Sequence, residues 1–147
     1  MATIRRAEVV WTGDLPSGSG VVSASSSRAF TDLPITWASR TESADGRTSP
    51  EELIAAAHAS CFAMAFSGGL GRLGKPPERL EVSASVAFDR VDGGWRVASS
   101  ALNVRGRVPG MDAAEFQRAA EEAKETCPVS QALKGNVDLS VEAVLEA

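Results

Sequence analysis

The chain has 147 residues, of which 44% are hydrophobic and 23% are charged, and its net charge is −4. We therefore expect one globular domain over residues 1–147, and the acidic balance argues against a nucleic-acid partner. The chain has two cysteines, and its first residues, MATIRRAEVV, do not resemble a signal peptide. Together these features predict a cytoplasmic protein.

The first third of the chain predicts three strands. Residues 4–11 and 21–24 are strand-like and flank a segment rich in turn residues, which is typical of a hairpin. Residues 33–37 predict a third strand, which Pro34 restricts to a sheet edge or a strand start. A polar loop over residues 40–48 follows.

A helix is predicted from Ser49 to Gly71. Ser49 and Glu52 form the sequence pattern of a capping box, and the Gly68-Gly69 pair is expected to end or loosen the helix. Because residues 53–66 are almost all apolar, we expect this helix to be buried on every side. That stretch is shorter than the roughly 20 apolar residues needed to cross a bilayer, so a core helix is expected and no membrane partner.

The second half of the chain predicts a hairpin, two helices and a last strand. Apolar residues alternate over residues 80–88, and a turn leads into a second strand over residues 95–108. Asp112 and Glu115 predict a capping box for a helix that ends near Thr126. The remaining elements are a short helix that opens at Cys127-Pro128 and a strand over residues 137–141.

The order of elements predicts an α+β domain with an antiparallel sheet of about six strands. One such sheet covers only one side of an apolar central helix. A second copy of the chain, with the same helix packed antiparallel to the first, would cover the rest, so a homodimer is expected.

Cys61 and Cys127 are the candidate nucleophiles. A thiolate is reactive near a cation or a helix N-terminus, whereas a thiol in apolar surroundings is inert. Cys61 lies in the middle of the central helix and would need a cation from elsewhere, while Cys127 lies at a helix N-terminus. Both could equally be small buried hydrophobes. The cysteines and the histidine lack metal-ligand spacing, so no metal is expected.

His58, the only histidine, lies three residues before Cys61. A Cys–His hydrolase pair is conceivable, but a core histidine that is hydrogen-bonded to a carbonyl or a serine is the simpler interpretation. Within one helical turn the two side chains point outward rather than toward each other.

Charged residues cluster at and before the start of the central helix. Glu51 and Glu52 both complement the helix dipole, and Glu52 also belongs to the capping box. Arg40 and Arg47 on the preceding loop are candidate cations, although solvation at the surface is the default for either.

Four segments resemble the OsmC/Ohr family, the osmotically inducible protein C and organic hydroperoxide resistance proteins. TSPEELIAAAHASCFAMAFS and TCPVSQALKGNVDL are similar to its two cysteine motifs, while WTGDLPSGSGVVS and VPGMDAAEFQRAAEEAKETCPVSQ resemble the OsmC branch. The resemblance implies antiparallel sheets around a long buried helix in an intertwined homodimer. It also implies a cysteine-based peroxidase that reduces organic hydroperoxides, and hydrogen peroxide less well.

The resemblance also implies roles for individual residues. Cys61 matches the peroxidatic cysteine, Cys127 the resolving cysteine and Glu51 the family's glutamate. The family's arginine best matches Arg40, with Arg47 as the alternative because the loop before Glu51 is one residue longer than usual. The chain has no tyrosine, and Trp37 is expected to fill the apolar role that a tyrosine often has in the family.

The implied reaction needs no cofactor. Cys61 would become a sulfenic acid and then form a disulfide with Cys127, which an external dithiol would reduce, and the resemblance implies a preference for a lipoyl-type dithiol. Trp37, Phe62 and Met64 are expected to line an apolar substrate pocket. A redox-sensing or binding domain without turnover, and the Cys61/His58 hydrolase, remain the alternatives.

Overall fold

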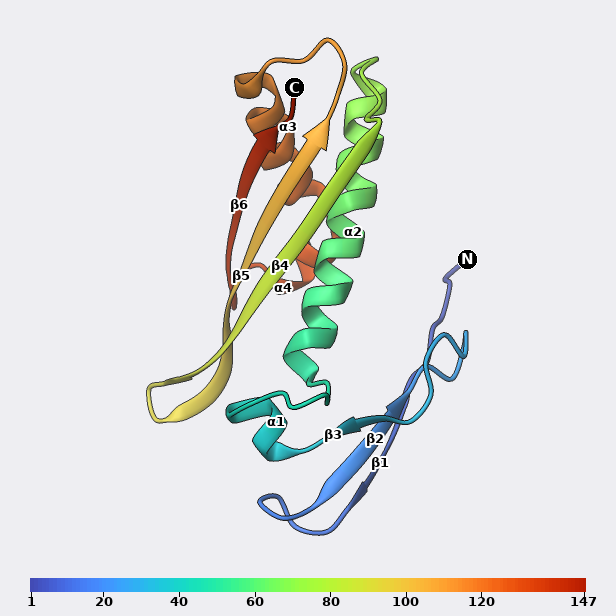
Figure 1. The fold of residues 1–147 in the computed structure, drawn as a ribbon, viewed down its shortest axis with the longest axis vertical. Coiled ribbons are helices and arrows are strands. Elements are labelled where there is room, and N and C mark those ends of the chain that lie inside the picture. The colour runs from blue at the N-terminus through green and yellow to red at the C-terminus, as the bar shows by residue number, and fades with distance from the viewer. The chain divides into compact units, whose positions relative to one another are not determined.

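The computed structural model describes residues 1–147, with six strands and four helices (Figure 1). The chain forms two compact units, residues 1–53 and residues 54–147, and we describe each by itself. Whether both units behave as one domain stays a prediction.

The first unit contains a three-stranded antiparallel sheet in the order β1-β2-β3. Its strands are β1 (Glu8–Thr12), β2 (Ser19–Ser23) and β3 (Leu33–Ile35). All three predicted strands are present, and β3 is shorter than expected.

A short helix, α1 (Trp37–Thr41), replaces the predicted end of the third strand and the start of the polar loop. The Thr36 hydroxyl accepts from the Ser39 backbone N–H, and the Ser39 hydroxyl accepts from the Thr36 backbone N–H, each at 3.0 Å. This capping box ends the strand at Ile35, so the prediction that Trp37 belongs to a strand is wrong.

The central helix, α2 (Pro50–Arg72), begins in the first unit and continues through the second. The Ser49 hydroxyl accepts from the Glu52 backbone N–H at 3.2 Å, as predicted. The Glu52 carboxylate, however, accepts from the Thr48 hydroxyl at 2.7 Å. The capping box is therefore only half formed at Ser49 itself.

The helix continues through Gly68-Gly69 and ends at Arg72, so the glycine pair does not end it. Lys75 N–H donates to the Leu70 carbonyl and Gly74 N–H to the Gly71 carbonyl, both at 3.0 Å. Gly74 has a φ of +74°, so these bonds form the left-handed terminal motif that favours glycine.

Within one chain, α2 is buried along one stripe only, and burial of its other sides by a second copy of the chain stays a prediction. His58, Phe62, Phe66 and Leu70 recur at intervals of four residues and are fully buried. By length and composition the 23-residue helix could cross a membrane, contrary to the sequence estimate, but an apolar core helix passes the same test. The buried stripe identifies α2 as a core helix.

The second unit contains a mixed sheet in the order β4-β5-β6. Strands β4 (Arg79–Val91) and β5 (Gly94–Arg107) form the predicted hairpin, and Asp92 and Gly93 both have positive φ angles, as a two-residue type I′ turn requires. Strand β6 (Asp138–Leu145) pairs parallel to β5.

The prediction of a single, wholly antiparallel sheet is therefore wrong in two respects: there are two sheets, and β6 runs parallel to its neighbour. The parallel pairing follows from the connection between β5 and β6, which contains two helices and carries the chain back across the sheet. These helices are α3 (Ala113–Thr126), with the predicted Asp112–Glu115 capping box, and α4 (Pro128–Leu133).

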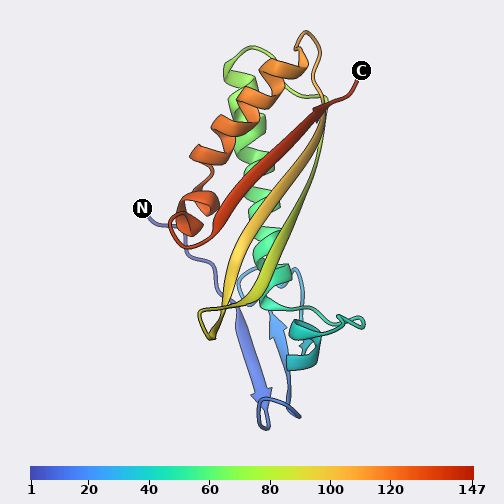
Figure 2. The same ribbon diagram turned by 90° about the vertical axis from the view of Figure 1, so that its left-hand side faces the viewer.

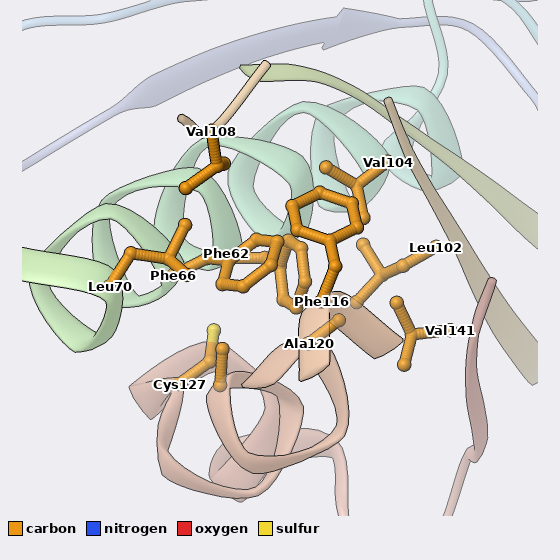
Figure 3. Packing of buried hydrophobic residues seen from close by; sticks show 11 residues of the cluster. Phe62, Phe66, Leu70, Leu102, Val104, Val108, Phe116, Ala120, Cys127 and Val141 are labelled. Atoms are coloured by element: carbon orange, nitrogen blue, oxygen red, sulfur yellow. The ribbon is translucent and has the colours of Figure 1, made fainter. Parts of the chain in front are cut away.

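Helices α2 and α3 lie along the same face of this sheet (Figures 1 and 2). The core between them contains three phenylalanine rings, and the Phe66 centroid lies 5.4 Å from that of Phe62 and 5.1 Å from that of Phe116 (Figure 3). A Cβ atom at Gly106 would lie 2.5 Å from Phe116, so only glycine allows α3 to approach β5 this closely.

Candidate active site

An ion pair joins Arg40 of α1 to Glu51 in the first turn of α2. The Arg40 Nε and Nη2 atoms donate to Glu51 Oε1 at 3.0 and 2.9 Å, and Nε also lies 3.2 Å from Oε2. The Glu51 side chain is 8% exposed and that of Arg40 is 31% exposed. A carboxylate this buried needs a charged partner, and Arg40 supplies it with two donors in a fixed orientation.

Arg40 rather than Arg47 is therefore the arginine that the structure pairs with Glu51. The Arg47 guanidinium lies 3.4 Å from the Asp45 carboxylate, and both side chains are exposed. The Arg40 guanidinium carbon also lies 5.9 Å from the centroid of the Trp37 ring, one turn earlier on α1. This contact is a cation–π interaction that orients Arg40 further.

The two cysteines meet in the second unit although they are 66 residues apart in the sequence. Cys61 is half-buried on α2, and Cys127 is fully buried at the start of α4; both are free thiols. The Cys127 sulfur points toward α2 (Figure 3), and its thiol is close enough to interact with that of Cys61. The structure thus brings together the two cysteines that the sequence singled out.

The surroundings of Cys61 within its own unit do not activate it. Burial raises the pKa of the Cys61 thiol from its ordinary value of 9.0, and the neighbouring Cys127 thiol adds to the rise. The backbone N–H of Val129, in the first turn of α4, donates to the sulfur and lowers the pKa, but the net effect is a rise. A cation is needed to make this thiol a good nucleophile at neutral pH.

His58 is buried between two serines. Its Nδ1 atom lies 2.6 Å from the Ser100 hydroxyl on β5, and its Nε2 atom lies 2.7 Å from the Ser130 hydroxyl on α4. Burial lowers the pKa of His58, so the imidazole is neutral at pH 7. Because both ring nitrogens already have partners, His58 has no nitrogen left to act as a base for Cys61, which argues against the hydrolase alternative.

Of the residues predicted to line a substrate pocket, Trp37, Phe62 and Met64, the second unit contains Phe62 and Met64. Phe62 is fully buried in the core of the second unit, whereas Met64 is 71% exposed. Residues two apart on a helix point to different sides, so Phe62 and Met64 cannot line the same face of α2. Trp37 belongs to the first unit, where it contacts Arg40.

Sequence reasoning missed Ser100, Val129 and Ser130. Ser100 lies on the buried face of β5, where the alternating pattern otherwise places apolar residues. A serine on this buried face needs a polar partner, and His58 is the only histidine of the chain. These two features were the signal that could have predicted the pair. No group of three or more His, Cys, Asp or Glu side chains could hold a metal ion.

Comparison with known proteins identifies the relatives of this chain. A family model described as OsmC-like protein matches residues 43–142. The chain is 40% identical to peroxiredoxin OsmC of Escherichia coli (strain K12) over 95% of its own length and 96% of that protein. It is 36% identical to an organic hydroperoxide resistance protein of Xanthomonas axonopodis pv. citri (strain 306) over 64% of the chain and 65% of that protein.

Solved structures show the same fold. The crystal structure of the organic hydroperoxide resistance protein OhrB of Bacillus subtilis has a TM-score of 0.71 at 24% identity, over 94% of this chain and 97% of that one. An organic hydroperoxide resistance protein from Elizabethkingia anophelis has a TM-score of 0.72 at 22% identity, over 99% of this chain and 100% of that one.

Proposed function

Because the chain belongs to the OsmC-like protein family, we propose that it is a cysteine-based peroxidase that reduces organic hydroperoxides, with Cys61 as the peroxidatic and Cys127 as the resolving cysteine. The observation that carries the residue assignment is that these two thiols lie near each other at the core of the second unit. Cys61 is the half-exposed member of the pair, and Cys127 is the buried one. The exposed thiol is the one that a hydroperoxide can reach.

The proposed cycle has three steps. The Cys61 thiolate attacks the terminal oxygen of the hydroperoxide, the O–O bond breaks, and the alkoxide leaves and takes up a proton to become the alcohol. The Cys127 thiol then attacks the sulfur of the Cys61 sulfenic acid; the S–S bond forms, the S–O bond breaks, and the hydroxyl leaves as water with the Cys127 proton. An external dithiol reduces the disulfide and is itself oxidised to a disulfide.

Arg40 is the proposed source of the positive charge. A guanidinium next to the Cys61 sulfur would lower the pKa of the thiol and donate hydrogen bonds to the peroxide oxygens. Glu51 would hold Arg40 by its two-point contact, and Trp37 would provide an apolar surface beside it. An apolar surface would favour organic hydroperoxides over hydrogen peroxide.

The proposed active form is a homodimer with sites shared between chains. Glu51 and Cys61 are ten residues apart on one continuous helix, which separates them by about 15 Å along the helix axis. Antiparallel packing of two such helices would bring Glu51 of one chain toward Cys61 of the other. The exposed side of α2, with Met64 71% exposed, and the exposed residues of strand β1 favour a partner of this kind.

The cycle requires no metal, haem or flavin, and we propose that only the external dithiol is needed, a lipoyl-type thiol being the family preference. It requires both thiols to be restored after each turnover, and this supports a reducing, cytoplasmic setting.

Mass spectrometry after one equivalent of cumene hydroperoxide tests the proposal. The wild type should form a Cys61–Cys127 disulfide, and the Cys127→Ser variant should keep a sulfenic acid on Cys61 that dimedone traps. In the Cys61→Ser variant, Cys127 should stay largely unmodified. A sulfenic acid on Cys127 in the wild type would reverse the assignment of the two cysteines.

Turnover distinguishes the proposed enzyme from the alternatives. A redox sensor would form the disulfide once but would not consume hydroperoxide catalytically in the presence of dihydrolipoamide. A Cys61/His58 hydrolase would not need Cys127, so Cys127→Ser would leave its activity intact.

A further inference from the structure

His58 connects the two helices that carry the cysteines. It is three residues before Cys61 on α2, and its partner Ser130 is three residues after Cys127 on α4. The hydrogen bond of 2.7 Å between His58 Nε2 and Ser130 Oγ therefore joins the two cysteine-bearing helices one turn away from each sulfur. A second bond of 2.6 Å, from Nδ1 to Ser100 Oγ, fixes the imidazole to strand β5.

All three members of this network are buried, since His58 and Ser100 are 0% exposed and Ser130 is 2% exposed. A neutral imidazole has one N–H donor and one acceptor nitrogen. One serine therefore accepts from the ring while the other donates to it. Losing either bond leaves a buried polar atom without a partner, so the imidazole is held in one orientation by both serines.

Helix α4 is short, and its Ser130 side chain ties its first turn to α2. It has six residues, and the Cys127 side chain makes no capping hydrogen bond to it. The Ser130 hydroxyl lies in this first turn, so its bond to His58 fixes the start of α4, and with it Cys127, relative to α2.

We propose that His58 is a positioning residue for disulfide formation: through Ser130 it holds Cys127 at the correct distance and angle to attack the sulfur of oxidised Cys61. This inference rests on the proposed two-cysteine cycle. His58 itself exchanges no proton with either sulfur. Its effect is confined to the second step, in which the S–S bond forms and water leaves, and does not extend to the reaction with peroxide.

Matched serine variants separate positioning from general stability. Ser130→Ala and Ser100→Ala each remove one buried hydrogen bond to the same imidazole, so both should destabilise the fold by a similar amount. Only Ser130→Ala should slow disulfide formation, by about 10- to 100-fold, because small displacements of a reacting group have effects of this size. Rapid quenching with dimedone followed by mass spectrometry would measure both steps, and the rate of Cys61 oxidation should stay unchanged.

Two variants of His58 give an independent test. The amide of glutamine can reach the position of Nε2, and that of asparagine the position of Nδ1, so His58→Gln keeps a partner for Ser130 and His58→Asn does not. His58→Gln should form the disulfide faster than His58→Asn. At high peroxide, His58→Asn and Ser130→Ala should also accumulate more Cys61 sulfinic acid than Ser100→Ala.

A glutathione titration makes the test independent of the peroxidase reaction. Oxidised glutathione converts the two thiols to a disulfide and is reduced to two molecules of glutathione, so the equilibrium reports the effective concentration of Cys127 at Cys61. Ser130→Ala should lower this value about tenfold or more, and Ser100→Ala should not. Equal effects of the two serine variants, or no effect of Ser130→Ala, would overturn the inference. Absence of a Cys61 sulfenic acid in the Cys127→Ser variant, together with absence of a disulfide in the peroxide-treated wild type, would instead refute the proposed function.

Discussion

The two regions that carry the candidate chemistry differ in how they hold charge. In the first unit, Arg40 and Glu51 form a charged pair with direct contacts of 2.9 and 3.0 Å, and the carboxylate is almost completely buried. Around Cys61 in the second unit, the polar groups are a neutral imidazole, two hydroxyls and a second thiol. The first region holds a fixed positive charge, and the second holds a nucleophile without one.

Neither region is therefore sufficient for thiol chemistry by itself. Burial raises the pKa of the Cys61 thiol, which lowers the fraction of reactive thiolate at neutral pH. Burial of the Glu51 carboxylate, in contrast, keeps Arg40 in one orientation. The Arg40 guanidinium stays partly exposed. The proposed function requires the two regions to be combined, and the expected source of the combination is a second chain.

The largest effect is expected from mixed dimers of Cys61→Ala chains and Glu51→Gln chains. Both homodimers should be poor peroxidases. If sites are shared between chains, the mixed dimer contains one site with native Cys61 and native Glu51, and it should regain about half of the wild-type activity per dimer, since one of two sites is intact. The rate of cumene hydroperoxide consumption by verified mixed dimers measures this recovery.

A second mixture provides the matched control. Cys61 and Cys127 meet within the second unit of one chain, so mixing Cys61→Ala chains with Cys127→Ser chains leaves no chain with both cysteines. This mixture should form no intramolecular disulfide. Recovery in the control, or no recovery with Glu51→Gln, would contradict shared sites of the proposed composition.

The second prediction concerns the charge that reaches Cys61. Arg40→Met should raise the pKa of the Cys61 thiol by about 1–3 units, because this is the usual effect of an opposite charge a few ångströms away. Arg47→Met is the matched control, since Arg47 pairs with the exposed Asp45. Titration of the Cys127→Ser background with monobromobimane measures the Cys61 pKa alone. The same rise in Arg47→Met would assign the role to the other arginine.

Much of the fold was predictable because it depends on local patterns. The alternation over residues 80–88, the Asp92-Gly93 turn and the Asp112 capping box each determine one element through neighbours in the sequence. The parallel pairing of β6 depends instead on where two helices carry the chain, and patterns within one element do not contain that information. Helix α1 is also local, but its Thr36–Ser39 cap has serine where the usual signature has glutamate or glutamine.

The site divides in the same way. The resemblance singled out Cys61, Cys127, Glu51 and Arg40, and the structure places them in two pairs. For His58 the sequence predicted only a core histidine that is hydrogen-bonded to a carbonyl or a serine, because its two serine partners lie 42 and 72 residues away. The pocket of Trp37, Phe62 and Met64 stays a prediction, although Phe62 and Met64 point to different sides of one helix.

The third prediction uses His58 to test whether the cysteine region is neutral. Burial lowers the pKa of His58 below the 6.5 of an exposed histidine, so the unfolded chain binds a proton at a higher pH than the folded one. Stability is therefore unaffected above pH 6.5 and is lost as the pH falls from 6.5 toward the folded-state pKa, by up to about 1.4 kcal/mol per pH unit. Urea unfolding between pH 5.5 and 7.5 measures this slope.

A direct titration supports the assignment, because the chain has only one histidine and its ring signals in an NMR spectrum are unambiguous. In the folded protein the imidazole should become protonated only at a pH below 6.5. A folded-state pKa above 6.5 would show that His58 is charged in the core, and the contrast between a neutral and a charged region would then be lost.

The smallest effects are expected from two helix caps, one for each unit, and they test whether the units unfold together. Ser49→Ala removes the acceptor for the Glu52 N–H at the start of α2, and Asp112→Ala removes the acceptor for the Glu115 N–H at the start of α3. Each loss should lower the free energy of unfolding by about 1 kcal/mol.

Because α2 crosses from one unit into the other, and a helix forms cooperatively, we expect one unfolding transition that both variants shift equally. Native-state hydrogen exchange read by mass spectrometry separates peptides of residues 1–53 from those of residues 54–147. Each variant should reduce the protection of the slowest amides in both units by the same factor, about fivefold for 1 kcal/mol. If Ser49→Ala weakened protection only in the first unit and Asp112→Ala only in the second, the chain would be two domains joined by a helix, and the single-domain prediction would be wrong.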